Sequence, residues 1–402
     1  MDSTTPENKT TDTGQQPPIR VVIQQPALPK YRLPVFRELA NRPGIDLTLY
    51  YGEVPGLTNV QPDGFRGEHV PISRWNLAGL EMKWHTPQRA NATMLHADVL
   101  ILSWDLHFTS LVPALMKARS EGVGTILWGH GYSKREGRLR RYLRNKVGSL
   151  ATALLFYNHT AARAAIAEGA DPVRVFVGLN SLDQTPIQTA RQSWLDRPDE
   201  LNAFQTANGL TPGRVVLFVS RLEADNRVDL LLAATSLMAK QFPDLKTVII
   251  GRGPDEARLR AMVQKLGIAN HVIMPGPIYD EEKIAPWFLS ATLFCYPANI
   301  GLSLLHAFGY GLPAVTSDKT ESQNPEIEAL RPGDNGAIYR DGDATDLARV
   351  LTQLLLNPEQ LTRFSQAAES TAREQFSMGL MVDGFESAIR YCISRSVNTT
   401  IA

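Results

Sequence analysis

Residues 295–315 read CYPANIGLSLLHAFGYGLPAV, and this stretch decides the fold. It predicts the end of a strand, a turn around Gly301, a helix that opens at Leu302–Ser303, and a second strand. A glycine turn entering a helix suits an anion, because the first backbone N–H groups of a helix have no partner within it. His306 lies one turn into this helix, and its spacing alone favours a structural histidine over a ligand-binding one.

Strands and helices alternate on both sides of this stretch. IRVVIQQ, ADVLILSW and GTILWGHG predict buried strands in the first half of the chain, and RVVLFVSR, KTVIIGRG and ATLFCYP predict them in the second. Helical segments separate these runs, a pattern typical of doubly wound α/β sheets. The sequence therefore predicts two facing Rossmann-like domains. Their ligands are expected in the cleft between them, at the carboxyl ends of the strands.

The alternation of strands and helices is interrupted once, at about residues 184–212. This segment is polar, holds three prolines and shows no strand pattern, so we predict that it is the interdomain linker. The first residues are polar and predict a disordered tail. The boundaries expected from these features are a disordered tail at 1–18, an N-terminal domain at 19–183, a linker at 184–212, a C-terminal domain at 213–375, and a C-terminal helix at 376–402 that could return to the N-terminal domain.

Composition narrows the class of protein. Lys plus Arg and Asp plus Glu both number 41 among 402 residues, so no net field favours nucleic acid as a partner. The two cysteines do not form a disulfide framework, which favours a reducing compartment and a cytoplasmic location. No metal-binding cluster or P-loop is found, and the first predicted turn lacks the glycines of a dinucleotide fingerprint. We therefore expect neither a metal nor an organic cofactor.

Several candidate binding residues follow predicted strands in the second half. Arg221 follows RVVLFVS, where a fixed guanidinium suits a diphosphate, although a solvated loop arginine is the more common case. Gly251 and Gly253 form a glycine turn before a helix, and an ordinary strand-to-helix turn is the likelier explanation for them. The backbone near Pro277 and Ile278 could lie flat against a base or form a plain turn.

The first half holds His130 directly after a strand, flanked by glycines that allow close approach of a ligand. The stretch from Lys134 to Lys146 that follows is dense in Lys and Arg, with Glu136 its one acidic residue. Most such runs are solvated helices. A run of almost only positive charges near a cleft could instead contact anionic lipid headgroups or a phosphorylated acceptor.

The second half of the chain, over about residues 205–376, resembles the retaining GT-B glycosyltransferases of family 4. FVSRLEADNRVDLLLAA, VIIGRGPDEARLRAMVQKLGIANHVIMPGPI and PANIGLSLLHAFGYGLPAV are similar, in order and spacing, to that family's motif blocks. The first half is a weaker match, through its early Q…YRLPVF and its WGHG. The resemblance implies a GT-B fold, with the acceptor on the N-terminal side and a nucleotide sugar in the C-terminal domain.

The resemblance also implies roles for single residues. Arg221 corresponds to the arginine that holds the donor diphosphate, and His130 to a histidine beside the transferred sugar, so these two are the candidate catalytic residues. The implied donor-binding residues are Asn226, Gly251, Gly253, Pro277, Ile278, Asn299, Gly301, Leu302, Ser303, His306 and Glu326.

Three positions depart from the family pattern. Asn226 replaces the usual lysine, and Ala298 and His306 replace the two glutamates of the E-x7-E pair, which indicates a divergent branch. His306 would take the place of the ribose glutamate, since it can still hydrogen-bond a hydroxyl.

The predicted function is transfer of a sugar, with retention, from a nucleotide-diphosphate sugar to a glycan, lipid-linked or small-molecule acceptor. An anionic membrane surface at the inner face of the cell membrane is a further expected partner, and nucleic acid is not. A non-catalytic nucleotide-sugar-binding partner protein and a same-fold sugar-nucleotide epimerase stay open as alternatives.

Overall fold

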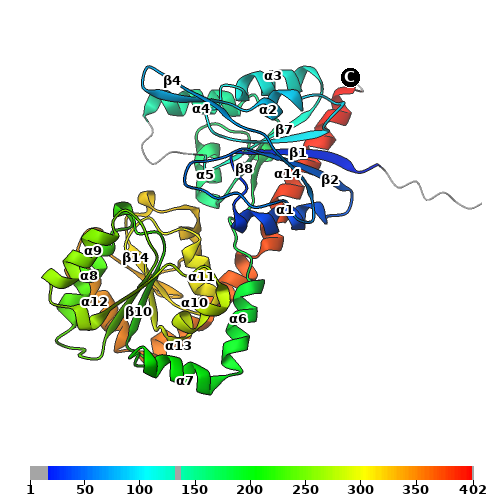
Figure 1. Ribbon diagram of the computed structural model, residues 1–402. Helices are drawn as coiled ribbons and strands as arrows, with labels where there is room; N and C mark the ends of the chain where they lie inside the picture. The colour runs from blue at the N-terminus through cyan, green and yellow to red at the C-terminus, as the bar shows by residue number, and fades with distance from the viewer. Residues whose placement is uncertain (1–16, 132–136, 401–402) are drawn as a thin grey trace, which may run out of the picture.

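The computed structural model describes residues 17–131 and 137–400, with the side chains of 396–400 excepted. Most of the predicted disordered tail (1–16), and Lys134 and Arg135 of the basic stretch, lie outside the described residues. The rest of the chain forms two α/β domains, one above the other in Figure 1. The predicted pair of facing Rossmann-like domains is thereby confirmed.

The N-terminal domain is built on a seven-stranded parallel sheet. In order across the sheet, its strands are β3 (Arg66–His69), β2 (Ile45–Tyr51), β1 (Ile19–Gln25), β6 (Val99–Ser103), β7 (Gly124–Gly129), β8 (Ala153–Phe156) and β9 (Val175–Val177). Its helices are α1 (Leu33–Ala40), α2 (Thr86–Ala90), α3 (Leu111–Ser120), α4 (Arg138–Gly148) and α5 (His159–Ala167). The central strands β6 and β7 are buried along their whole length because helices cover both faces of the sheet.

An antiparallel hairpin of β4 (Ser73–Leu77) and β5 (Leu80–Trp84) interrupts this domain between β3 and β6. The sequence pattern does not predict this hairpin. Its turn holds Ala78 and Gly79 at positive φ, the backbone that a two-residue hairpin requires. Leu77 and Leu80 at its tip are exposed, so the hydrophobic signal of a buried strand is absent here.

The C-terminal domain is built on a six-stranded parallel sheet. Its order is β12 (Val272–Gly276), β11 (Lys246–Ile250), β10 (Val215–Val219), β13 (Leu293–Cys295), β14 (Ala314–Ser317) and β15 (Gly336–Tyr339). Its helices are α8 (Val228–Met238), α9 (Glu256–Lys265), α10 (Glu281–Ser290), α11 (Ser303–Gly309), α12 (Ala344–Leu355) and α13 (Pro358–Ser370).

The segment at 184–212 contains two helices, α6 (Thr185–Leu195) and α7 (Pro198–Ala207). They pack on the C-terminal domain: the Trp194 indole donates to the carbonyl of Glu282 at 2.8 Å, and the Phe204 ring meets the Trp287 ring edge to face at 4.9 Å. Pro186 and Pro198 lie at the starts of these two helices, where the missing N–H removes no helical hydrogen bond.

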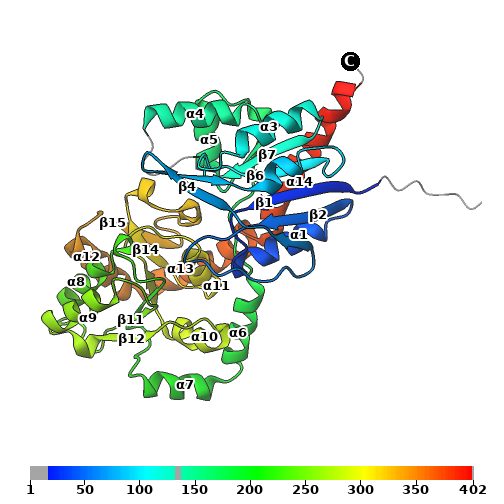
Figure 2. The same cartoon turned by 45° about the horizontal axis from the view of Figure 1, so that its top comes forward.

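The last helix, α14 (Met378–Thr400), leaves the C-terminal domain and packs against the N-terminal sheet. Figures 1 and 2 show it in red behind β7 and β1. Met381, Phe385 and Ile389 of α14 are buried in the same cluster as Phe36 and Trp128. The N-terminal core is therefore built from both ends of the chain. Among the described residues, no helix combines the length and the apolar character needed to cross a membrane.

Candidate active site

The order of the strands reverses once in each sheet. In the C-terminal sheet the reversal lies between β10 and β13, and in the N-terminal sheet between β1 and β6. In open α/β sheets the crevice at such a reversal, outside the carboxyl ends of the strands, is the usual ligand position. Arg221 and the Gly301 turn follow β10 and β13, so two of the predicted donor-binding features flank the same reversal.

The Arg221 side chain is 70% exposed, and its Nη1 lies 3.5 Å from Glu223 Oε1. A Cβ atom added to Gly56 of the N-terminal domain would lie 3.8 Å from its Nη2, so the guanidinium extends to the opposite wall of the cleft. An exposed pair of this kind contributes little to stability. Arg221 is therefore available to an anionic ligand.

Asn226 is buried rather than at the cleft surface, with 3% exposure. Its side chain donates to the carbonyl of Arg221 at 2.7 Å and accepts from Asn299 at 3.3 Å. Asn324 in turn donates to the Asn299 carbonyl at 3.0 Å. These amides tie the turn after β10 to the turn after β13. A direct contact of Asn226 with the donor stays a prediction.

Gly251 and Gly253 have a structural explanation. A Cβ atom at Gly251 would lie 1.8 Å from the carbonyl oxygen of Ser220, and one at Gly253 would lie 2.2 Å from that of Leu222. Gly251 also has φ +150°. The turn after β11 thus packs directly on the turn that presents Arg221, and larger residues would push the two apart. Pro277 and Ile278 follow β12 at the same edge of the sheet, with Pro277 exposed.

Gly301, Leu302 and Ser303 lead into α11 and are all partly accessible. A buried hydrogen bond fixes the start of this turn: the backbone N–H of Ile300 donates to Gln323 Oε1 at 2.7 Å. A Cβ atom at Gly301 would lie 3.2 Å from the Asn324 side chain, so the turn has little room for a larger residue. Ala298, where the family has a glutamate, is buried.

His306 projects from α11 toward α10. Its Nε2 lies 2.8 Å from Glu281 Oε1, and its ring lies 4.5 Å from that of Phe288. The Tyr310 hydroxyl donates to the same Glu281 oxygen at 2.6 Å. Burial opposes ionisation of Glu281, yet the hydrogen bonds from His306 and Tyr310, with the charge of Lys30 across the cleft, hold its pKa below the usual value. The sequence gives no signal for this partner, because Glu281 lies 25 residues from His306 in the chain.

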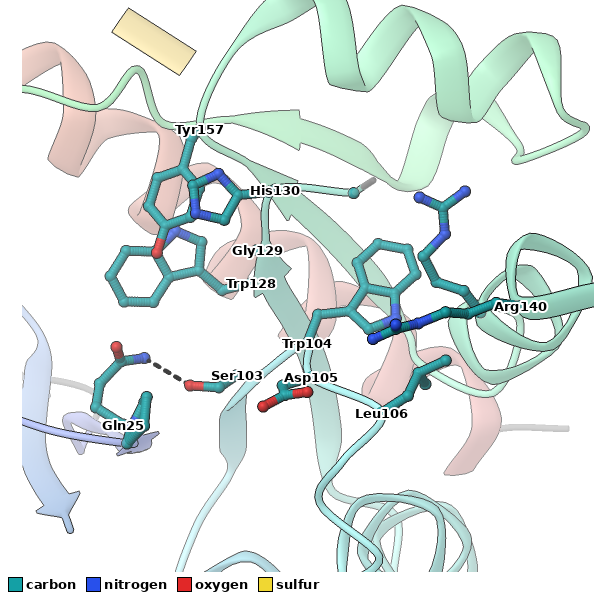
Figure 3. Close-up of a pocket in the computed structure, with 13 residues that line it drawn as sticks. Gln25, Ser103, Trp104, Asp105, Leu106, Trp128, Gly129, His130, Arg140 and Tyr157 are labelled. Carbon is teal, nitrogen blue, oxygen red and sulfur yellow. Dashed lines mark hydrogen bonds between the residues drawn. The ribbon is translucent and has the colours of Figure 1, made fainter. Parts of the chain in front are cut away.

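A cavity of about 330 Å³ lies at the reversal of strand order in the N-terminal sheet, between β1 and β6 (Figure 3). His130 lines it, beside the Tyr157 ring at 4.7 Å. The other lining residues are Gln25, Pro26, Ser103, Trp104, Asp105, Leu106, Trp128, Gly129, Gly131, Arg140, Arg144 and Tyr157. Most of these lining residues lie at or just after the carboxyl ends of β1, β6, β7 and β8. Their position after a predicted strand is the feature of the sequence from which Asp105 and Tyr157 could have been found.

Among the described residues that line this cavity, Asp105 is the one acidic residue. Its Oδ1 accepts from the backbone N–H of His107 at 3.0 Å and lies 2.6 Å from His107 Nδ1, while its Oδ2 lies 3.3 Å from Lys83 Nζ. Burial opposes ionisation, but the His107 hydrogen bonds and the Lys83 charge hold the pKa of Asp105 below its usual value. Asp105 is therefore a carboxylate at neutral pH.

Glu326 lies at the junction of the two domains, 3% exposed, and its Oε1 accepts from Asn180. Arg32 donates to Asn180 Oδ1 at 2.9 Å, with its guanidinium 5.0 Å from the centre of the Trp128 ring. The contacts place Glu326 in a chain of polar groups that joins the domains, and its predicted role toward the donor remains a prediction.

A second contact holds the domains together at this junction. The carboxylate of Glu328 accepts from the backbone N–H groups of His159 and Thr160, at 2.9 and 2.5 Å. These two N–H groups lie at the start of α5. A carboxylate of the C-terminal domain therefore caps a helix of the N-terminal domain. Within 17–131 and 137–400, no group of three or more His, Cys, Asp or Glu side chains is placed to hold a metal ion.

Comparison with known proteins agrees with this geometry. Residues 202–371 match the family model described as glycosyl transferases group 1. Anabaena HepE in complex with UDP superposes with a TM-score of 0.68 at 13% identity, over 92% of this chain and 99% of that one. The fold is that of the GT-B glycosyltransferases. The segment 202–371 is a group 1 glycosyltransferase domain, which confirms the resemblance seen in the sequence at that level.

Two curated relatives are informative. A phosphatidyl-myo-inositol mannosyltransferase of Mycobacterium leprae is 32% identical over 41% of this chain and 44% of its own length. A GDP-mannose-dependent α-(1-6)-phosphatidylinositol monomannoside mannosyltransferase of Mycolicibacterium smegmatis is 23% identical over 66% of this chain and 69% of its own length. The chain spans less than half the length of several other relatives, including an exopolysaccharide phosphotransferase and a putative glycosyltransferase.

Proposed function

We propose that this protein is a retaining glycosyltransferase that moves a sugar from a nucleotide-diphosphate sugar to an acceptor held in the N-terminal cavity. The match of residues 202–371 to the group 1 model is the observation that supports it most. Arg221 and the Gly301 turn, at the strand reversal of that same segment, are the groups that would receive the diphosphate. The proposal needs no metal or organic cofactor, and it places the protein in the cytoplasm.

The proposed chemistry depends on charge. As the glycosidic bond breaks, negative charge develops on the leaving diphosphate. Preorganised donors stabilise such charge strongly in a cleft that excludes water. Arg221 and the amides around Gly301 would supply these donors, and His130 would lie beside the transferred sugar. Attack by the acceptor on the same face as the leaving group is what the family resemblance implies, and it gives retention without a protein nucleophile.

The test is donor hydrolysis and transfer by the purified protein, after a thermal-shift screen of nucleotide sugars. The screen includes UDP- and GDP-sugars, because HepE was solved with UDP and one relative is named GDP-mannose-dependent. Stabilisation with slow hydrolysis of one donor is expected. Binding without any turnover would favour the non-catalytic alternative, which the replacements at Asn226, Ala298 and His306 motivate. Appearance of an epimeric sugar nucleotide would favour the epimerase.

His306 gives the first prediction. If it binds the donor's ribose, His306→Ala raises the donor KM with a smaller effect on kcat, because the contact is present in both the ground state and the transition state. His306→Gln, which keeps a hydrogen-bonding group, retains more of the binding. His306→Glu is a poor substitute here, since it would place a second carboxylate beside Glu281.

The matched control for this prediction is Tyr310→Phe, which removes the other hydrogen bond to Glu281 and leaves His306 in place. Steady-state kinetics and calorimetry with the donor decide the matter. Unchanged donor affinity in His306→Ala would make His306 a structural histidine that orients Glu281.

A second prediction concerns an anionic membrane surface as partner. Arg138, Arg141 and Lys146 of α4 are exposed, and so are its Leu139 and Tyr142 side chains, at 72% and 57%. A helix that exposes both basic and apolar side chains is typical of peripheral membrane binding. We expect preferential binding to anionic vesicles, by about 1 kcal/mol for each engaged basic residue, and weakening by salt.

Sedimentation with phosphatidylserine-containing vesicles, against phosphatidylcholine alone, measures this preference. Leu139→Ser with Tyr142→Ser should lower binding at constant charge. Equal sedimentation with both vesicle types at low salt would leave α4 as a solvated basic helix.

A further inference from the structure

Two neighbouring helices of the C-terminal domain share the carboxyl group of Glu281. This residue begins α10, and α11 lies beside α10 in both views of the fold (Figures 1 and 2). Glu281 Oε1 lies 2.8 Å from His306 Nε2 and 2.6 Å from the Tyr310 hydroxyl. An ionised carboxyl group can only accept hydrogen bonds, so both groups on α11 are donors to it. They fix the direction of the Glu281 side chain.

The other oxygen of this carboxyl group, Oε2, is open to a ligand. In the part of the chain that the structure describes, the hydrogen bonds and the ion pair of the side chain all go to Oε1. Oε2 is not one of the buried side-chain atoms that lack a partner, and the Glu281 side chain is 27% exposed. Oε2 is therefore an accessible acceptor on a side chain that is already held in place.

The acidic residues on either side of Glu281 are engaged elsewhere. Asp280 caps α10, because its Oδ1 accepts from the backbone N–H of Glu282 at 3.0 Å. The Glu282 carboxylate accepts from Ser193 at 3.0 Å and from Arg197 at 2.5 Å, both on the side of α6 and α7. Glu281 is thus distinct from its neighbours, since its contacts are to α11.

Glu281 lies between the two turns that the proposed function assigns to the donor. Pro277 and Ile278, the predicted base-binding turn, directly precede α10. On the other side, the backbone N–H of His306 donates to the carbonyl of Leu302, so His306 lies one helical turn, about 5.4 Å, beyond the Gly301 turn. In a nucleotide the ribose joins the base to the diphosphate, so a ribose bound across these two turns would lie next to Glu281.

We infer that Glu281 binds the ribose hydroxyls of the donor through Oε2, with His306 and Tyr310 as positioning residues that hold its Oε1. The inference rests on the proposed function, because it requires a nucleotide in the C-terminal domain. An acidic side chain after a strand is a common partner of ribose hydroxyls in α/β nucleotide sites, and a carboxylate oxygen can accept from more than one hydroxyl. Glu281 lies outside the sequence blocks that carry the family resemblance.

Calorimetry of the full chain tests this with UDP and GDP, each against its 2′,3′-dideoxy counterpart. The parent should bind the ribonucleotide at least about tenfold more tightly, the scale of a hydrogen bond to a charged group. Glu281→Ala should weaken binding of the ribonucleotide and leave that of the dideoxynucleotide nearly unchanged, so the ratio of the two affinities should fall close to one. Both ligands are measured on the same variant, so a general loss of affinity leaves the ratio intact.

Matched variants separate the site from its surroundings. Glu281→Gln should lower the ratio, because it removes the charge, while Glu282→Gln makes the same change on the next residue and should keep the parental ratio. Tyr310→Phe removes one of the two donors to Oε1 and should lower the ratio by a smaller factor than Glu281→Ala. A purely structural role of Tyr310 would change the thermal melt without changing this ratio.

The inference is overturned if neither UDP nor GDP binds, if the parent does not distinguish ribose from dideoxyribose, or if Glu281→Ala keeps the parental ratio. A ratio that falls in His306→Ala but not in Glu281→Ala would assign the ribose to His306 and also overturn it. Failure of the proposed function looks different. In that case the ratio depends on Glu281, and the parent protein neither hydrolyses nor transfers from any nucleotide sugar.

Discussion

Arg221→Ala is expected to lower the rate of sugar transfer by at least about 10²-fold, the scale of losing one preorganised donor to developing charge. Family members of this kind have a lysine five residues further on. Here that position is Asn226, which is buried and bound to the Arg221 backbone. If Arg221 binds the donor diphosphate, as we propose, it does so without that lysine. The effect should appear mainly in kcat, because the leaving-group charge is greatest in the transition state.

Two neighbouring variants make this prediction specific. Arg221→Lys keeps the charge but not the planar pair of donors, so it should recover only part of the rate. Glu223→Gln removes the carboxylate 3.5 Å from the guanidinium and should not slow transfer. Near-parental kcat in Arg221→Ala, measured at saturating donor, would remove Arg221 from the diphosphate site.

Phe385→Ala is expected to destabilise the N-terminal domain by about 3–5 kcal/mol, the usual cost of emptying a buried phenylalanine site. Phe385 lies on α14 with no exposed surface, and its ring meets that of Trp128 edge to face at 4.7 Å. Trp128 forms part of the wall of the N-terminal cavity, so the same substitution should also loosen that wall. Because the chain has two domains, unfolding in urea should be followed by tryptophan fluorescence and by circular dichroism together.

Leu380→Ala is the control, since Leu380 lies on the same helix and is 45% exposed. It should change the free energy of unfolding by no more than a few tenths of a kcal/mol, as surface substitutions usually do. A loss below 1 kcal/mol in Phe385→Ala would show that α14 is dispensable for the N-terminal core.

The sequence predicted the fold well because the determining signals are local. IRVVIQQ became β1 and RVVLFV became β10, since runs of β-branched residues that are buried on both faces have few other solutions. The hairpin of β4 and β5 was missed because Leu77 and Leu80 face solvent, so no buried pattern marks it. The helices within 184–212 were missed because prolines at helix starts resemble those of a linker.

The site was less accessible to prediction because its contacts join distant parts of the chain. Arg221 and Gly301 could be placed from the strands before them. The pairing of His306 with Glu281, and the buried position of Asn226 between two turns, depend on how separate loops pack. The Trp104 and Trp128 indoles look like ordinary core residues in the sequence. Only the structure shows that both residues line one cavity.

The return of α14 to the first domain has a consequence for biosynthesis. Residues 381–392 complete a core that begins at Val21, so a ribosome must synthesise the chain as far as α14 before that core can close. The C-terminal domain, whose buried residues run from Ile187 to Phe376, has all its parts earlier. Domains that fold during synthesis usually do so from the N-terminus. In this protein the second domain in sequence can complete its core before the first domain can.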